Sequence, residues 1–230
     1  MLLACSALLA CATNADPGWQ LRHDRIIAVR VTPPHLLAGQ VAEIDALVTS
    51  VDGGVAVQTP AAASAAAPLA GIVSQSGSGW QVTAPDEATL GAARAALGLA
   101  DGAVISVQLS TTFVVGGETL VANKLVYFGD THENPEPGAV TVDGAPPESA
   151  SPVPFDTDVA LRISEDAANT VSWLTSCGSF DNDNNEHAAL LHVKPGESIT
   201  GQLAVVVRDP LGGVGWQTWP LSSHAQTTTP

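Results

Sequence analysis

The sequence predicts an all-β protein that contains two β-sandwich domains. Short segments of alternating apolar and polar residues recur along the chain, and turns rich in glycine or proline separate them. One segment alone, at 85–99, has the three- to four-residue apolar spacing of a helix. A proline-rich polar stretch at 131–138 divides the 230 residues into two parts, each long enough for one sandwich.

The first domain is expected to span residues 25–130. An apolar run at 26–31 ends before two prolines, and the next segment alternates so that Glu43 and Asp45 share the face opposite its apolar side chains. Residues 104–114 alternate most regularly, and two consecutive glycines after them predict a turn into a partner strand. These segments predict the strands of one sandwich.

Residues 57–100 are interpreted as an insertion in this domain. The first part, 57–79, is rich in Ala, Ser, Gly and Pro, which predicts a long loop. The second part predicts one short helix, because Pro85 lies near its start and two acidic residues follow, where they suit the positive end of the helix dipole. Because of this insertion, the sequence leaves undecided whether the strands of the first domain form a closed sandwich.

The second domain is expected to span residues 139–221, after the linker at 131–138. The tail at 222–230 is expected to be disordered. Alternating residues predict strands at 159–163 and 171–175, and further strands are predicted at 189–193, at 202–208, which is rich in β-branched residues, and at 214–219.

Residues 1–11 are predicted to be a signal peptide. Their apolar run is shorter than the about 20 residues that span a bilayer, and Leu-Leu-Ala-Cys occurs twice, ending at Cys5 and at Cys11. This pattern resembles the lipobox of bacterial lipoproteins. The resemblance implies cleavage before Cys11, or less favourably Cys5, and acylation of that cysteine, with residues 12–24 as a polar tether.

The lipoprotein interpretation predicts an exported protein with a lipid anchor in the cell envelope. The outer membrane is favoured, because Ala12 and Thr13 replace the aspartate that retains some lipoproteins at the inner membrane. Basic residues that normally precede such a signal are missing, so we expect the natural translation start to lie upstream. The alternative is an apolar start with incidental cysteines. Cys177 is the cysteine left in the exported body, and we expect it to be buried.

The second half carries three motifs, at 171–173 (Val-Ser-Trp), 177–180 (Cys-Gly-Ser-Phe) and 205–216 (a valine run, then Arg-Asp and Gly-Gly before Trp). These motifs resemble the immunoglobulin-like modules of bacterial surface proteins. The whole layout resembles uncharacterised surface lipoproteins of the myxobacterial type. The resemblance implies two immunoglobulin-like β-sandwich domains with Trp173 in the core, and it brings no known activity or catalytic residue.

The chain is acidic, with 8 Lys and Arg against 23 Asp and Glu and a net charge of −15. Nucleic acids and anionic membrane surfaces are bound through basic patches. The two lysines, Lys124 and Lys194, lie far apart in the sequence. The composition therefore excludes nucleic acid as a partner, and it leaves a membrane reached through a lipid anchor, an unidentified envelope protein or a glycan.

An oxygen-rich run in the second domain is the candidate metal site. Asp181, Asp183 and Asn185 have the spacing of the first half of a calcium loop. An EF-hand loop also needs Gly at its sixth position and Glu at its twelfth, where this chain has Glu186 and His192. A plain turn is the favoured interpretation, calcium is the alternative, and no other cofactor is predicted.

Trp219 is the candidate binding residue. It lies three positions after Trp216 on one predicted strand, so the two side chains face opposite sides. An exposed Trp219 is able to stack on a sugar or a partner protein, and packing against the tail is the alternative. Solvent-exposed positions are expected for all histidines, which are His23, His35, His132, His187, His192 and His224.

No nucleophile-elbow, phosphate-binding or Cys-x-x-Cys motif occurs in the chain, and Glu43 with Asp45 fits an exposed polar face. We therefore expect no enzymatic activity. The favoured function is a structural, adhesive or scaffold role as a lipid-anchored cell-envelope protein. The alternative is a glycan- or calcium-binding surface module.

Overall fold

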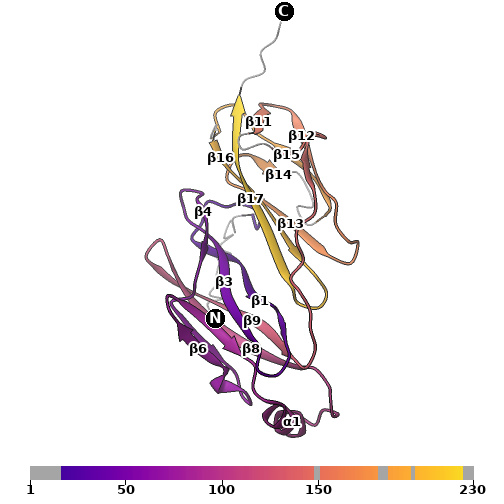
Figure 1. Cartoon of the computed structure of the whole chain (residues 1–230). Helices are drawn as coiled ribbons and strands as arrows, with labels where there is room; N and C mark the ends of the chain where they lie inside the picture. The colour runs from indigo at the N-terminus through magenta and orange to yellow at the C-terminus, as the bar shows by residue number, and fades with distance from the viewer. Residues whose placement is uncertain (1–16, 148–150, 181–185, 198–199, 225–230) are drawn as a thin grey trace, which may run out of the picture.

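A computed structural model describes residues 17–147, 151–180, 186–197 and 200–224. The first half of these residues forms one β-sandwich and the second half forms another, joined by a single connection (Figure 1). Across these four ranges, no helix is long and apolar enough to cross a membrane.

The first domain contains strands β1 to β9, helix α1 and one short 3-10 helix, η1. Their bounds are β1 Arg25–Thr32, β2 His35–Leu36, β3 Val41–Thr49, β4 Val55–Gln58, β5 Ala62–Ala65, η1 Ala70–Ile72, β6 Val73–Ser76, β7 Gly79–Thr83, α1 Glu87–Ala96, β8 Ile105–Val115 and β9 Glu118–Phe128.

The second domain contains strands β10 to β17. Their bounds are β10 Val140–Val142, β11 Ser151–Pro154, β12 Asp158–Ile163, β13 Thr170–Thr175, β14 Ser179–Phe180, β15 Ala188–His192, β16 Thr200–Arg208 and β17 Val214–His224.

Both domains have the same topology. The first domain pairs a β1-β3-β7-β6 sheet with a β2-β9-β8-β5 sheet, and the second pairs β10-β12-β15-β14 with β11-β17-β16-β13. In each domain a short strand, β2 or β11, runs parallel to the last strand of its domain. In immunoglobulin domains, a sheet of four strands in the order A-B-E-D faces a sheet that contains strands C, F and G. The two sheets of each domain here have this arrangement. The predicted fold class is confirmed, and the first sandwich is closed.

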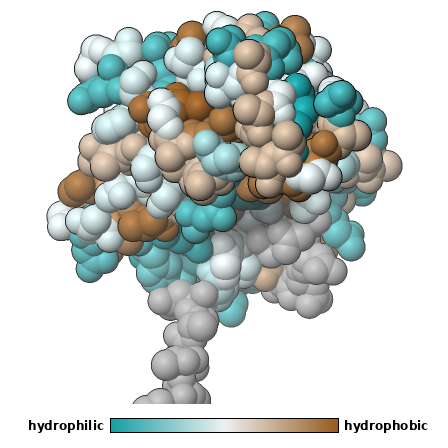
Figure 2. All heavy atoms as spheres, turned by 90° about the horizontal axis from the view of Figure 1, so that it is seen from below, coloured by the Kyte–Doolittle hydropathy of each residue, from teal (hydrophilic) through white to brown (hydrophobic). Residues whose placement is uncertain are grey.

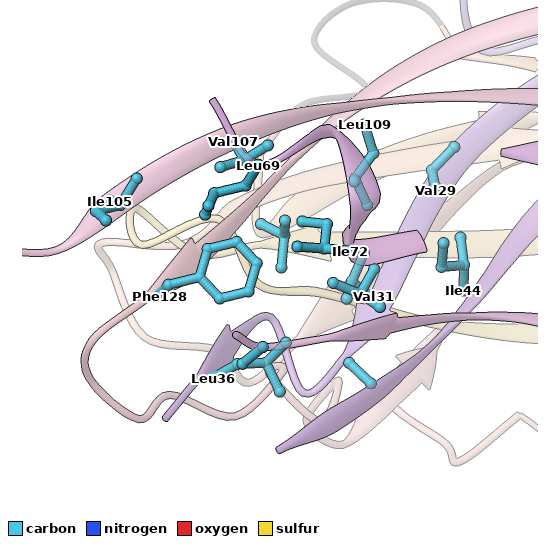
Figure 3. Packing of buried hydrophobic residues seen from close by; sticks show 14 of the residues in the cluster. Val29, Val31, Leu36, Ile44, Leu69, Ile72, Ile105, Val107, Leu109 and Phe128 are labelled. Carbon is cyan, nitrogen blue, oxygen red and sulfur yellow. The ribbon is translucent and has the colours of Figure 1, made fainter. Parts of the chain in front are cut away.

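The core of the first domain lies between its two sheets (Figure 3). Strand β8 is alternately buried and exposed, as its sequence predicts, and it points Ile105 and Leu109 inward. Val31 and Ile44 meet them from the opposite sheet. Each such fully buried side chain stabilises the fold by about 1.5–3 kcal/mol, so the alternation decides which face of each strand is internal.

The core of the second domain contains Trp173, which is fully buried. The indole Nε1 of Trp173 donates a hydrogen bond to the backbone oxygen of Glu186 at 2.8 Å, which satisfies its one polar atom. Cys177 packs in the same core, and burial raises the pKa of its thiol. The predictions that Trp173 and Cys177 are buried are both confirmed.

Residues 57–79 differ from the long loop that their composition predicts. They contain the strands β5 and β6, together with the end of β4 and the start of β7. Strand β5 pairs with β8 from Ala62 opposite Thr112 to Ala65 opposite Leu109. The loop prediction is wrong because Ala and Ser, although weak strand formers, fit an edge strand whose register is set by a strong neighbour.

Residues 17–24 differ from the predicted polar tether. Leu21 is fully buried, and its backbone nitrogen donates to the Thr175 oxygen at 2.9 Å. The ring of Trp19 packs edge-on against that of Phe180, with centroids 5.8 Å apart. The segment therefore lies against the second domain, because its two large apolar side chains find buried positions there.

The structure also describes the predicted linker and the first residues of the predicted tail. No strand is assigned at 131–138, where the linker was expected. Strand β17 continues to His224, so residues 222–224 belong to a strand and not to the tail. They continue the strand because β11 pairs with them in parallel.

Helix α1 begins where the sequence predicts. The Asp86 side chain caps it by accepting a hydrogen bond from the Thr89 backbone nitrogen at 2.8 Å.

At this end of the molecule, apolar side chains interrupt the polar surface in several places (Figure 2). The large apolar residues exposed around α1 and the β2–β3 connection are Leu37, Val41, Leu97, Leu99 and Val104.

Candidate functional site: the junction between the two domains

A third hydrophobic cluster joins the two domains. It consists of Leu21, Ala28, Leu47, Leu174, Ala204, Val206 and Val214. In β16, Val205 and Val207 face the second core, whereas Ala204 and Val206 face the first domain. Strand β16 therefore buries both faces, and the outer faces of two sheets pack against each other as the layers of one core do.

Two arginines border this cluster. Arg30 of β1 pairs with the Asp45 carboxylate of β3 through contacts of 3.0 and 2.6 Å. The Arg30 guanidinium also lies 3.9 Å from the ring centroid of Trp216 in β17, a cation–π contact between the domains. Arg208 of β16 donates to the Ile27 backbone oxygen at 3.1 Å. Each domain thus extends one arginine onto the other.

Asp209 organises the turn between β16 and β17. Its carboxylate accepts hydrogen bonds from the backbone nitrogens of Leu211 at 2.8 Å and Gly213 at 2.9 Å. Gly212 has a φ of 92°, and a Cβ there would lie 2.7 Å from the ring of Tyr127 in β9. Glycine allows both the backbone conformation and the close approach, so this turn of the second domain lies directly on the first domain.

Two histidines complete this contact. His35 of β2 is 4% exposed. Its Nδ1 lies 2.7 Å from the Asp130 carboxylate, and its Nε2 donates to the Leu211 backbone oxygen at 2.8 Å. His132 Nε2 lies 2.8 Å from the Asp209 carboxylate. Both ring nitrogens of His35 therefore have a hydrogen-bond partner, and the expectation of a solvent-exposed His35 is wrong.

The linker is part of the same contact. The Asn134 side chain donates to the Val31 backbone oxygen at 2.9 Å, and its oxygen accepts from the Val214 backbone nitrogen at 2.9 Å. A Cβ on Gly215 would lie 2.0 Å from the backbone oxygen of Pro135. Asn134 therefore bridges the two domains directly, and the linker lies flat against β17.

Lys124 of β9 is a half-buried lysine at the junction. Its ammonium group donates a hydrogen bond to the backbone oxygen of Gly212. Burial lowers the pKa of this group to about 8; the nearby Asp209 carboxylate opposes the shift, and Arg208 adds to it. The folded protein therefore releases the Lys124 proton more readily than the unfolded chain does.

This shift predicts a pH dependence of stability. Because the folded pKa of Lys124 lies below its unfolded value, the unfolded state binds more protons between about pH 8 and 10.4. The free energy of unfolding is therefore expected to rise through this window relative to that of Lys124→Met, which has no such proton. Urea unfolding at a series of pH values measures the difference, and parallel profiles for parent and variant would show that the Lys124 pKa is unshifted.

A groove of about 810 Å³ opens beside the junction. Its walls come from β3, β4, the β6–β7 turn, the linker and β17, and Glu43 and Asp45 lie in it. One face of the Trp216 ring already carries the Arg30 guanidinium. Among the residues that the structure describes, no three His, Cys, Asp or Glu side chains are arranged to hold a metal ion.

The residues predicted as sites are not brought together. Trp219 is half-buried and packs against the second core, while Trp216, on the opposite face of β17, reaches the junction. The candidate lipidation and calcium residues lie outside the described ranges, and they are Cys5, Cys11, Asp181, Asp183 and Asn185.

The junction residues carried one signal in the sequence. A strand with one buried face alternates, but residues 46–48 and 203–207 are apolar without interruption. Such runs indicate strands buried on both faces. The contacts of His35 with Leu211 and of Asp209 with His132 had no comparable signal, because these partners lie 176 and 77 residues apart in the chain.

This chain is similar to several solved structures. They include the fibronectin(III)-like modules of CbhA from Clostridium thermocellum, with 13% identity, 88% of this chain and 97% of that chain covered, and a TM-score of 0.31. The tandem Ig repeats of Dlar share 9% identity over 88% and 98% of the two chains, with a TM-score of 0.32. The titin domains z1z2 share 12% sequence identity with this chain, over 89% of this chain and 100% of that chain, with a TM-score of 0.25. No protein-family model and no curated protein matches the sequence.

Proposed function

We propose that this protein is a non-enzymatic, lipid-anchored component of the bacterial cell envelope, in which two immunoglobulin-like domains act as one rigid scaffold. The observation that carries the proposal is the shared buried junction. Domains in one chain move relative to each other unless their interface is extensive and hydrophobic. Here an apolar cluster, two arginines and the Asp209 turn all connect the domains, so the proposed role is to hold surfaces at a fixed separation.

The anchor in this proposal is the lipobox that ends at Cys11. Two or more acyl chains on this cysteine are enough to hold a protein stably on a membrane. The segment that follows reaches the second domain at Trp19 and Leu21. In the proposal the anchor is thereby connected to the rigid body by a short piece of chain.

Intact mass spectrometry of protein purified from the membranes of a Gram-negative host tests this proposal, with the gene extended to an upstream start. The expected mass is that of the chain from Cys11 plus acyl groups. Cys11→Ser is expected to remove the acyl mass and release the protein from the membrane, whereas Cys5→Ser is the matched control and leaves the modification in place. An unmodified parent chain in the soluble fraction would contradict the proposal.

A further inference from the structure

The groove beside the junction is built by both domains. Its floor is the outer face of the β1-β3-β7-β6 sheet, where Thr32, Glu43 and Gln81 lie side by side on β1, β3 and β7. One wall comes from the end of β4 and the β6–β7 turn, and the other comes from the linker and β17. The groove therefore has this shape only while the second domain is packed on the first.

Gly79 leaves the floor of the groove hollow. It begins β7 and pairs with Ser76 of β6, on the same side of the sheet as Gln81. A Cβ at Gly79 would meet no described atom closer than 3.8 Å, and its φ lies outside the left-handed region. The fold thus has room for a side chain at this position, and the absence of one leaves that room to a ligand.

The groove also offers hydrogen-bonding groups of both kinds. Its volume of about 810 Å³ lies within the range of about 300–1,000 Å³ that is typical of ligand-binding clefts. Gln58 and Gln81 line it, and no residue in the described ranges hydrogen-bonds their side chains. Because an amide group carries two donors and an acceptor, these glutamines suit a ligand that both donates and accepts, as a peptide backbone does.

The charges in the groove select a cationic ligand. Among its described lining residues, four carboxylates lie with the one guanidinium of Arg30, which gives a net charge of −3. Asp45 is paired with Arg30, whereas Glu43, Glu133 and Glu136 are exposed and have no ion-pair partner in the described part of the chain. A cleft lined by one sign of charge attracts the opposite sign, and the net charge of −15 of the whole chain acts in the same direction.

The aromatic side chains at the groove favour a polypeptide over a glycan. The Trp216 ring carries the Arg30 guanidinium on one face and packs against the junction cluster. Trp80 packs against the core of the first domain. Both rings are already engaged, whereas a sugar ring stacks on an aromatic face that is free.

We propose that the groove binds an extended segment of a partner protein that contains lysine or arginine. The cationic side chains of this segment pair with the three exposed glutamates, and its backbone amides hydrogen-bond to the two glutamine side chains. A polyamine has the same charge, but it lacks the carbonyl groups that an amide N–H binds. This inference adds a binding site to the scaffold of the proposed function.

An NMR titration of the full chain carrying Cys11→Ser tests the inference. The probe is a seven-residue peptide with blocked ends in which four lysines alternate with threonines. The expected result is saturable shifts of the backbone amide signals of groove residues. We expect the dissociation constant to rise about fivefold or more between about 20 and about 150 mM sodium chloride, because salt screens exposed charges. The same peptide with glutamine in place of every lysine is expected not to bind.

One pair of variants tests the charges. Glu43→Gln combined with Glu136→Gln removes two carboxylates from the groove and is expected to weaken binding of the lysine peptide about tenfold. The matched control is Glu118→Gln combined with Asp101→Asn, which removes two carboxylates from exposed positions outside the groove. The control is expected to bind as the parent does.

A second pair of variants tests the shape of the groove without changing any charge. Gly79→Leu fills the hollow in the floor and is expected to abolish measurable binding. The matched control is Gly71→Leu, at an exposed position outside the groove where a Cβ would have no atom within 4 Å. Both variants are expected to keep the amide spectrum of the folded parent, so a loss of binding in Gly79→Leu is not a loss of folding.

The inference is overturned if the lysine peptide causes no saturable shifts, if both charge variants weaken binding equally, or if Gly79→Leu binds as the parent does. Spermine, which matches the four charges of the peptide, is expected to bind more weakly, and equal affinity would assign the groove to a polyamine instead. Binding of the neutral oligosaccharide chitotetraose, with none of the peptide, would assign it to a glycan. None of these results bears on acylation at Cys11, so failure here is distinguishable from failure of the proposed function.

Discussion

Val206→Asp is expected to separate the two domains while leaving both sandwiches folded. Val206 is fully buried and faces the first domain, and it contributes to the junction cluster rather than to either sandwich core. The two arginines that border the cluster are already engaged by the Asp45 carboxylate and the Ile27 backbone oxygen. A carboxylate at this position is therefore buried without a free cationic partner, and burying an unpaired charge is among the most destabilising single changes. We expect the free energy of unfolding to fall by about 3–5 kcal/mol.

Two measurements check this result. Calorimetry is expected to change from one thermal transition to two, because the domains lose their shared core. Electron–electron distance measurements between labels at Gln108→Cys and Arg162→Cys are expected to change from a narrow to a broad distribution. Val121→Asp, at a side chain 63% exposed in β9, is the matched control and is expected to change neither. A broad distribution in the parent protein would contradict the rigid junction itself.

Asp209→Ala is expected to have the second largest effect, because one carboxylate serves both the β16–β17 turn and His132 in the linker. The substitution removes the acceptor for two backbone N–H groups and the partner of His132. Loss of the acceptor for the part-buried Gly213 and His132 donors is expected to lower the free energy of unfolding by about 1–3 kcal/mol. Asp209→Asn keeps one oxygen that is able to accept both turn hydrogen bonds, so we expect it to lose roughly half as much.

The lowered pKa of Asp209 predicts that the free energy of unfolding declines as the pH becomes acid. Burial by itself raises the pKa of the Asp209 carboxyl group, but hydrogen bonds from His132, Gly213 and Leu211 outweigh burial and hold this pKa below its usual value. The resulting stabilisation is present above the unfolded pKa of about 3.9 and is lost as the pH falls through the folded pKa. Urea unfolding between neutral and acid pH is expected to show a shallower decline for Asp209→Asn than for the parent. Equal slopes would mean that Asp209 has an ordinary pKa.

Much of the fold was predictable because strand alternation is a local property. Residues 104–114 alternate in the sequence, and β8 buries the predicted face over its whole length. The Asp86 cap and the first turn of α1 were predictable for the same reason, since a cap and the backbone it satisfies lie within three residues. Residues 57–79 were not, because their small side chains have weak preferences and their strands exist through pairing with β8 and with β3.

The candidate site was less predictable than the fold. The alternation places Trp216 and Trp219 on opposite faces of one strand, but the strand itself does not tell which face meets the other domain. The valine run of β16 carried that information, because a strand inside a single sandwich has no reason to be apolar on both faces.

By itself, the sequence determined that this chain is an acidic, all-β protein of two immunoglobulin-like domains with Trp173 and Cys177 inside. The tertiary structure alone decided that the domains share a core. The physical reason is separation along the chain: His35 meets Leu211 176 residues away, and Arg208 meets Ile27 181 residues away. Local patterns fix which side of a strand is buried, but contacts of this range exist only once both sandwiches have formed and packed.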